Sequence, residues 1–446
     1  MAPKRRFDRF RLPANLTQRW RARLRAQRTW WRRRWRATAG DDVLFPAAGG
    51  GMVAVETLAR GGARPGPRIA ILHATAGSGH KRAAQALAAG LARLDPAAIV
   101  EDVDTLVFAS RLYRGSYASG YHVLAARAPA VWGVLYRSWE LAPLKRGAGA
   151  VRLMDRLNLR RLARVVERER PNAIVCTHFL PVEALSPIRG RGELQVPLYC
   201  VITDFAAHPF WAFPHVDRYF VASDAVASEL QGHGIARERI EVTGIPIDPR
   251  FAERVGRDEA RRRLGIDPRR PMVLVMGGGS GVGPLGELAE RLAALASRPQ
   301  VWVACGTNQG LRARIESLPS AATGDVRALG FTQDVDLLLE ACDVLVSKAG
   351  GLTCAEALVK HVPLVVFRPT PGQEVRNAQY LEQAGAAVHA DSVDEVAATV
   401  GRWLSDREER ARVCAAAARI ARPDAARVIA ERVLSAVGSG ARADVA

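Results

Sequence analysis

The stretch Ser347-Lys-Ala-Gly-Gly-Leu-Thr-Cys-Ala-Glu356 follows an apolar run, Val344 to Val346, and decides how the second half of this chain is interpreted. The pattern predicts a strand, a glycine turn and a helix whose first backbone amides remain uncovered. Such a helix start binds anions such as a diphosphate, because its free N–H groups and the helix dipole both favour negative charge. Glu356 follows Leu352 and Thr353 by one helical turn, so its carboxylate is placed to accept the two vicinal hydroxyls of a ribose. The stretch therefore predicts a nucleotide site.

Length and composition indicate a globular protein with large cores. At 446 residues, of which 48% are hydrophobic, the chain is expected to form two domains and an appendage. Six cysteines are scattered without a Cys-x-x-Cys pair, which favours buried thiols in a reducing compartment over a structural zinc site. An uninterrupted apolar segment of about 18 residues is missing, and no apolar segment follows the N-terminal charge. We therefore expect neither a membrane-spanning helix nor a secretory signal.

Most of the positive charge lies at the N-terminus. Residues 1–40 contain thirteen arginines and Lys4 against one acid, Asp8, so this arm carries +13 of the net charge of +19. Four of the nine tryptophans are interleaved with these arginines. This mixture is typical of a segment that binds an anionic membrane surface, where basic side chains meet phosphates and indoles lie among the headgroups. A disordered tail and a nucleic-acid-binding arm are the alternatives, since any polyanion attracts such a segment.

The rest of the chain alternates strands with helices in two series. This alternation predicts the α/β class, with two facing Rossmann-like domains and a ligand cleft between them. Gly244-Ile-Pro-Ile-Asp-Pro249 separates the two series and predicts a hinge, because its prolines and glycine interrupt both helices and strands. We expect an arm and connector (1–66), two Rossmann-like domains (67–245 and 246–420), and a C-terminal helix and tail (421–446). The predicted strands are 68–73, 99–102, 173–177, 198–203, 218–222 and 240–243 in the first domain, and 272–276, 300–305, 326–329, 344–346, 364–367 and 387–389 in the second.

A second glycine turn, His73-Ala-Thr-Ala-Gly-Ser-Gly-His80, ends the first of these strands and precedes an expected helix at 81–94. Its small residues let a ligand approach the backbone closely. The start of a helix disfavours imidazolium, so His80 is expected to stay neutral and able to accept a proton. The alternative is a histidine that only caps the helix.

Thr203-Asp-Phe-Ala-Ala-His208 follows another strand end, so Asp204 and His208 are expected to face the same cleft. Either side chain is able to orient or deprotonate a hydroxyl group. The alternative is an aspartate that caps a helix beside a surface histidine. The apolar residues that follow predict either an acceptor-binding rim or ordinary packing: Phe210, Trp211 and Phe213.

Two further motifs are less specific. Gly277-Gly-Gly-Ser-Gly-Val-Gly283 predicts another anion-binding turn, with Gly278 and Ser280 at the donor. Two Asp-Val-Asp sequences, Asp102 to Asp104 and Asp334 to Asp336, invite a metal-binding interpretation. The second one starts an amphipathic helix, where Asp334 is better explained as a cap or as compensation of the helix dipole. We therefore expect no metal site.

An aromatic stripe follows the first domain's second strand. Such spacing most often marks a core, but an aromatic face followed by Lys145-Arg146 also suits docking to a bilayer and admitting a lipid. The stripe consists of Tyr113, Tyr117, Tyr121, Trp132, Tyr136 and Trp139.

From about Pro67 to Ile420 the chain resembles the processive diacylglycerol glucosyltransferases and monogalactosyldiacylglycerol synthases. These enzymes are relatives of the peptidoglycan lipid N-acetylglucosaminyltransferase and share the two-domain GT-B fold. The motifs are specific for the family when taken together, although they do not distinguish its sugars. They are Gly77-Ser-Gly-His80, Thr203-Asp204 with His208, Gly330-Phe331, Lys348-Ala-Gly-Gly-Leu-Thr353 with Glu356-Ala-Leu358, and Pro371-Gly-Gln-Glu374 with Asn377.

The resemblance implies an inverting enzyme that moves a hexose from a UDP-sugar to diacylglycerol or a glycosyl-diacylglycerol, forming a β-glycolipid. It implies a peripheral protein on the inner face of the cell membrane, with the acceptor in the first Rossmann-like domain and the donor in the second. No metal or other cofactor is implied, because backbone amides and cations such as Lys348 and Arg376 hold the leaving UDP.

The resemblance also assigns roles to individual residues. His80 is the first choice for the general base, with Asp204 or His208 as alternatives. The acceptor and membrane residues are Tyr117, Tyr121, Trp132, Trp139 and Trp211. The donor residues are Gly278 and Ser280, Phe331 at the uracil, Lys348, Gly350, Gly351, Leu352 and Thr353 at the diphosphate, Glu356 at the ribose, Gln373 and Glu374 at the sugar hydroxyls, and Asn377.

Two other functions remain open at this point. One is a UDP-sugar transferase that acts on another lipid or on a soluble acceptor. The other is a nucleic-acid-binding protein that uses the basic arm. The identity of the sugar is open as well, among glucose, galactose, glucuronic acid and an N-acetylhexosamine.

Overall fold

The computed structural model describes residues 66–75, 78–110, 113, 145–279, 281 and 283–443, together with the backbone of 44–46 and 52–54. The chain divides into two compact units, Met1–Pro65 and Gly66–Ala446. In the first unit, β1 (Leu44–Pro46) pairs with β2 (Met52–Ala54) in an antiparallel ribbon. The second unit contains two parallel sheets of six strands each.

The first sheet has the strand order β4-β3-β5-β6-β7-β8, and every neighbouring pair is parallel. Its central strands are short apolar runs buried along their length, as expected for strands covered on both faces. The strands are β3 (Arg68–His73), β4 (Ile99–Asp104), β5 (Ala173–Cys176), β6 (Leu198–Val201), β7 (Arg218–Val221) and β8 (Ile240–Val242). Its helices are α2 (Ser78–Leu94), α5 (Lys145–Glu169), α6 (Phe179–Gly190) and α7 (Asp224–Gly232), with short 3-10 helices η2 (Thr105–Phe108), η3 (Pro209–Trp211) and η4 (Arg237–Arg239).

The second sheet has the order β11-β10-β9-β12-β13-β14 and is also entirely parallel. Its strands are β9 (Met272–Met276), β10 (Gln300–Ala304), β11 (Val326–Leu329), β12 (Val344–Ser347), β13 (Leu364–Phe367) and β14 (Ala387–Ala390). Its helical elements are η5 (Pro249–Phe251), α8 (Arg257–Leu264), α9 (Leu285–Ala293), α10 (Gln309–Glu316), α11 (Pro319–Ala322), α12 (Val335–Ala341), α13 (Gly351–Val359), α14 (Gln373–Gln383), α15 (Val393–Ser405) and α16 (Arg407–Ile420).

The prediction of two parallel α/β sheets is therefore confirmed. Each predicted strand is present, and its ends lie within two residues of the prediction. The described residues of the two sheets form the first lobe (strands β3–β8) and the second lobe (strands β9–β14), names used below. The predicted domain boundaries at residues 66, 245 and 420 stay predictions.

Both sheets reverse their strand order beside a glycine turn. In the first lobe the reversal lies between β3 and β5, and in the second between β9 and β12. The register pairs Ser347 at the end of β12 with Met276 at the end of β9. Ligands of open parallel sheets bind at such reversals, beyond the carboxyl ends of the strands. The topology thus brings the turns after β3, β9 and β12 to the positions where a ligand is expected.

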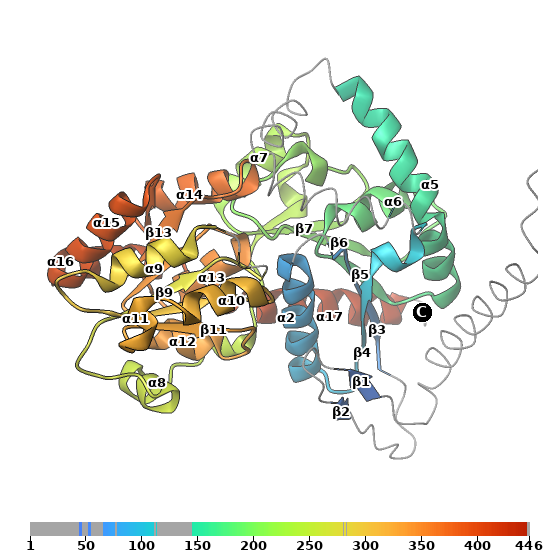
Figure 1. The fold of residues 1–446 in the computed structure, drawn as a ribbon. Coiled ribbons are helices and arrows are strands. Elements are labelled where there is room, and N and C mark those ends of the chain that lie inside the picture. Colours follow the sequence, from blue (N-terminus) through green and yellow to red (C-terminus); the bar gives the residue numbers. More distant parts are fainter. Residues whose placement is uncertain are drawn as a thin grey trace, which may run out of the picture. The chain divides into compact units, whose positions relative to one another are not determined.

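The C-terminal helix α17 (Ala425–Ala443) returns to the first lobe and packs against α2 (Figure 1). Ile429, Ala430 and Val433 share a buried core with Ile69 and Ile71 of β3. A side chain at Gly90 would come within 3.0 Å of the carbonyl oxygen of Ala426, so the two helices touch closely only because residue 90 is a glycine. The last helix of the chain therefore completes the core of its first sheet.

All six cysteines are unpaired thiols, and five of them are buried, as the sequence predicts. Burial raises the pKa of the Cys176 thiol well above its usual value, so this group stays protonated. These cysteines act as small apolar residues of the cores.

Replacing Ile429 by Ala is expected to destabilise the protein by about 2–5 kcal/mol, because its fully buried side chain would leave a cavity between α17 and the first sheet. The measurement is chemical unfolding followed by circular dichroism. Glu431→Ala on the exposed side of the same helix is the control and should change stability by less than about 0.5 kcal/mol. Equal losses in the two variants would contradict this packing.

Candidate active site

Helices α2 and α13 lie side by side and start at the same end. A side chain at Gly79 of α2 would lie 3.6 Å from Leu352 of α13. One turn further along both helices, Arg82 Nη2 lies 2.5 Å from Glu356 Oε1. Because the contacts advance in the same direction on both helices, their two N-termini are neighbours. Two positive dipole ends and their free N–H groups thus meet at one place, which favours an anion there.

The glycine loop after β9 reaches the same place. A side chain at Gly279 would lie 3.2 Å from Ser78 Oγ, at the start of α2, and one at Gly278 would lie 3.9 Å from Lys348 Nζ. Gly278 has a φ of 72°, a left-handed conformation that glycine adopts without strain. The two glycine turns therefore meet as expected, while the predicted contact Ser280 lies outside the described residues.

The turn between β12 and α13 is tightly constrained. Ala349, with a φ of 66°, is one of five non-glycine residues in the left-handed region among those the structure describes. A side chain at Gly351 would overlap the carbonyl oxygen of Thr203 in the first lobe. Only glycine fits at this position, so the start of α13 lies directly against the end of β6.

Glu356 is a buried carboxylate with one unused oxygen. Its side chain is 1% exposed, and Oε1 accepts a hydrogen bond from Arg82. Among the described residues, Oε2 has no partner. Burial raises the pKa of Glu356 to about 7, Arg82 opposes that shift, and Asp248 and Asp336 add to it. An orphaned buried acceptor of this kind fits the predicted contact with a ribose hydroxyl.

His80 is held in the tautomer that a general base needs. Its Nδ1 lies 2.8 Å from the carbonyl oxygen of Thr177 and 2.9 Å from Thr203 Oγ1. A carbonyl oxygen only accepts, so Nδ1 carries the proton, and Nε2 of the neutral ring keeps its lone pair. Burial lowers the pKa of His80 to about 4, the Thr177 carbonyl opposes this, and nearby His73 lowers it further. The ring is therefore neutral at physiological pH.

Asn377 connects the two lobes through both the oxygen and the nitrogen of its side-chain amide. Its Nδ2 donates to Asp204 Oδ1 at 2.9 Å and to the Ala349 carbonyl at 3.1 Å, while its Oδ1 accepts from the Phe205 backbone at 2.7 Å. Burial raises the pKa of Asp204, and the bond from Asn377 opposes that shift. In this arrangement Asn377 orients Asp204 and the turn before α13. Its predicted direct contact with the donor stays a prediction.

His208 serves as a cap. Its Nδ1 accepts from the Phe210 backbone N–H at 3.3 Å at the start of η3. The neutral ring then carries its proton on Nε2 and has no lone pair there to take another. This geometry favours His80 over His208 as the base.

Trp211 packs beside His80 and does not form part of an exposed apolar rim. Its side chain is 5% exposed, with its ring 6.2 Å from that of His80 and 5.8 Å from that of Phe179. Phe213 is 3% exposed and Phe210 half-buried. The apolar rim expected from these aromatic residues is therefore mostly a buried wall. The other predicted acceptor and membrane residues lie outside the described residues: Tyr117, Tyr121, Trp132 and Trp139, as well as the arm of residues 1–40.

The other residues predicted to bind the donor differ in their exposure and in the ion pairs that they already form. Phe331 is 62% exposed and presents an open ring to a base. Lys348 Nζ lies 3.5 Å from Glu374 Oε1, so part of its charge is already balanced. Arg376 pairs with Glu229 of α7 at 2.5 Å, which leaves it a weaker candidate for a cation at the diphosphate. Three further predicted contacts are half-buried: Gly350, Thr353 and Gln373.

The sequence interpretation missed three residues of the site. Thr177 fixes the His80 tautomer, and His178 packs its ring 4.5 Å from that of His80. Arg82 holds Glu356. Thr177 ends a predicted strand and His178 follows it, so the rule already applied to the other strand ends would have found both. Arg82 had no local signal, because its partner is 274 positions away.

The Asp-Val-Asp sequences have other partners. Asp102 lies 3.1 Å from His73 Nε2, and Asp104 accepts from Thr75 and from the first turn of η2. Asp334 stands at the start of α12, but its carboxylate makes no capping bond. Among the described residues no group of three or more His, Cys, Asp or Glu side chains is arranged to hold a metal ion.

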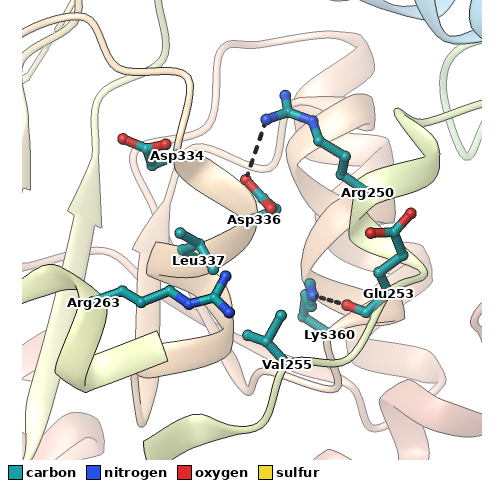
Figure 2. Close-up of a pocket in the computed structure, with 8 residues that line it drawn as sticks. All are labelled: Arg250, Glu253, Val255, Arg263, Asp334, Asp336, Leu337 and Lys360. Atoms are coloured by element: carbon teal, nitrogen blue, oxygen red, sulfur yellow. Dashed lines mark hydrogen bonds and ion pairs between the residues drawn. The ribbon is translucent and has the colours of Figure 1, made fainter. Parts of the chain in front are cut away.

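Figure 2 shows a separate pocket between η5, α8 and α12, lined by none of the predicted donor or acceptor residues. Its charges are matched within the protein. Arg250 lies 3.1 Å from Asp248 and 3.9 Å from Asp336, and Lys360 Nζ lies 2.6 Å from both Glu340 Oε2 and the Glu253 carbonyl oxygen. The pocket thus offers a ligand few unsatisfied groups.

No helix in the described part of the chain combines the length and the apolar character needed to span a bilayer.

Comparison with known proteins matches both lobes. Residues 80–247 match the monogalactosyldiacylglycerol (MGDG) synthase family, and residues 272–429 match the glycosyltransferase family 28 C-terminal domain. A processive diacylglycerol beta-glucosyltransferase of Bacillus cereus (strain ATCC 10987 / NRS 248) is 31% identical over 278 residues, which are 62% of this chain and 71% of that protein. The protein of the same name from Bacillus subtilis (strain 168) is 32% identical over 56% of this chain, and the match spans 65% of that relative's length.

Solved structures with the same architecture include two glycosyltransferases. MurG of Acinetobacter baumannii has a TM-score of 0.54 and 16% identity, covering 83% of this chain and 99% of its own. The glycotransferase of kitacinnamycin has a TM-score of 0.56 and 15% identity, covering 84% and 100%. These similarities show that the second unit has the GT-B fold.

The side chain of His80 is expected to remain neutral down to about pH 5, because its pKa is held near 4 by burial. The measurement is an NMR titration of the protein with isotope-labelled histidine, in which His80→Gln identifies the His80 signal. A His80 signal that changes between about pH 6 and pH 7, where an unperturbed imidazole titrates, would contradict the assigned environment.

Proposed function

Because this chain belongs to the family of processive diacylglycerol glucosyltransferases and monogalactosyldiacylglycerol synthases, we propose that it transfers a hexose from a UDP-sugar to diacylglycerol or a glycosyl-diacylglycerol. The product is a β-glycolipid. The family relatives carry the name of that reaction, and glucose is accordingly the first sugar to test.

One observation carries this proposal: a ready anion site and an orphaned carboxylate oxygen lie on the same helix. The N-termini of α2 and α13 and the side chain of Lys348 supply positive charge for a diphosphate. The unpartnered Oε2 of Glu356 lies on α13 beyond that site and is suited to a ribose hydroxyl. Exposed Phe331 offers a surface for the uracil.

His80 gives the site its chemistry. Its Nε2 takes the proton of the acceptor hydroxyl as that oxygen attacks the anomeric carbon of the sugar. The bond from the anomeric carbon to the diphosphate oxygen breaks, and UDP leaves with the electron pair. The configuration at that carbon inverts, so an α-linked donor gives a β-glycoside. Asp204 is the alternative base.

The two lobes divide the substrates between them. We assign the acceptor to residues 67–245 and the donor to residues 246–420. The diphosphate charge is balanced by backbone amides and by Lys348, so the proposal needs no metal. The protein acts as a peripheral enzyme on the inner face of the cell membrane, where the arm of residues 1–40 binds anionic lipid.

Incubation with UDP-glucose and diacylglycerol vesicles is expected to yield a lipid heavier by one or more hexoses, detected by mass spectrometry. UDP-galactose, UDP-glucuronic acid and UDP-N-acetylglucosamine complete the panel. Glu356→Ala should weaken UDP binding about 10- to 100-fold, since it removes a charged hydrogen-bond acceptor. His80→Ala should lower turnover about 10²- to 10⁴-fold with little change in UDP affinity. Equal loss of binding and turnover in the His80 variant would move the base to Asp204.

Full-length protein is expected to sediment with vesicles that contain anionic lipid, and deletion of residues 1–40 should release a large part of it. The reason is the arm's charge of +13, of which each basic residue near the surface contributes about 1 kcal/mol. Neutral vesicles are the control. Full-length protein that stays in the supernatant would favour a soluble acceptor. Nucleic-acid binding by the isolated arm, together with a core that takes up no UDP, would favour the nucleic-acid alternative.

A further inference from the structure

Arg82 is a charged residue of the first lobe that pairs with Glu356, the residue proposed to bind the ribose. It lies on α2, and its Nη2 is 2.5 Å from Glu356 Oε1 on α13, across the two lobes. The Arg82 side chain is 37% exposed, whereas that of Glu356 is 1% exposed. The ion pair therefore joins a partly exposed guanidinium group to a fully buried carboxylate.

The two carboxylate oxygens of Glu356 differ in their hydrogen-bond partners. Arg82 occupies Oε1, and Oε2 has no partner among the described residues. The contact at Oε1 and the close packing around a side chain that is 1% exposed together restrict rotation of the carboxylate, so they also restrict the direction of Oε2. One turn earlier, Leu352 lies so close to Gly79 that an added Cβ would be 3.6 Å away, which is consistent with the register of the two helices that this contact requires.

The charge balance around Glu356 makes Arg82 necessary. The charged groups that act on Glu356 come from three elements: Arg82 on α2, Asp248 before η5 and Asp336 on α12. Both aspartates are acids and oppose its ionisation. Each lies near Arg250, at 3.1 Å for Asp248 and 3.9 Å for Asp336. Arg82 is thus the cation that favours the ionised form of Glu356.

We propose that Arg82 is a positioning residue of the donor site, supplied by the acceptor-binding lobe, which favours the carboxylate form of Glu356 and orients its free oxygen toward the donor ribose. This inference rests on the proposed function. Its consequence is that the affinity for a uridine nucleotide depends on the contact between lobes as well as on the second lobe itself.

The test compares Arg82→Met with the unmodified protein in calorimetric titrations with UDP from about pH 7 to pH 9, above the phosphate ionisation near pH 6. Burial already raises the pKa of Glu356 to about 7, and loss of Arg82 removes a cause that lowers it. The variant should therefore bind UDP about tenfold more weakly at neutral pH for each unit by which that pKa rises. Its affinity should recover as the pH increases, because the carboxylate then forms without help.

Three further variants separate positioning from simple structural support. Arg82→Lys keeps the charge and should restore most of the affinity and the normal pH profile. Glu356→Gln should bind weakly at every pH, and adding Arg82→Met to it should cause no further loss. Arg93→Met is the matched control, since Arg93 lies on the same helix and pairs with Glu253 across the lobes at 3.5 Å while both side chains are more than half exposed. It should bind UDP like the unmodified protein.

The outcomes are distinct. An Arg82→Met profile that matches the unmodified protein would overturn the proposal, and so would an equal loss at every pH, which marks a purely structural contact. No heat from UDP with the unmodified protein would overturn the proposed function, and the donor role of Arg82 with it. Thermal melting of each variant identifies any loss that comes from unfolding.

Discussion

The burial of one carboxylate, Glu356, at the contact between two helices from different lobes is the constraint on which the site depends. A buried charge is costly unless another charge or a hydrogen bond compensates it. Here Arg82 compensates one oxygen only, and burial holds the pKa near 7. The second oxygen remains unsatisfied among the described residues. This oxygen therefore keeps its capacity to accept a hydrogen bond.

The contact between the lobes includes polar and glycine-dependent interactions. Asn377 joins Asp204 to the turn before α13, Arg376 joins α14 to Glu229, and Gly351 lies against Thr203. The C-terminal helix α17 adds an apolar contact, since it belongs to the core of the first lobe. The parts of the site that come from the two lobes are therefore held together by residues that are distant in the sequence.

The architecture could largely be predicted from the sequence. Short apolar runs separated by helical patterns identify the strands, because buried parallel strands need apolar side chains on both faces. The glycine turns after β3, β9 and β12 were evident for a similar reason, since close approach of a backbone requires a missing side chain. Helices α6, α8, α10, α11 and α14 were not recognised, and α17 was predicted as a C-terminal helix without its position on the first sheet. The apolar face of α17 is evident from the sequence, but the sequence does not indicate which sheet this face packs against.

The sequence by itself determined the strands and the glycine turns, and it identified His80 and Glu356 as candidate site residues. These features are local, because strand ends, glycines and helix starts are defined by neighbouring residues. Only the tertiary structure decided that Thr177 sets the tautomer of His80, that His208 is a cap, and that Arg82 meets Glu356. Hydrogen bonds and charge pairs depend on distances of a few ångströms between segments far apart in the chain, and those distances exist only after the lobes have packed.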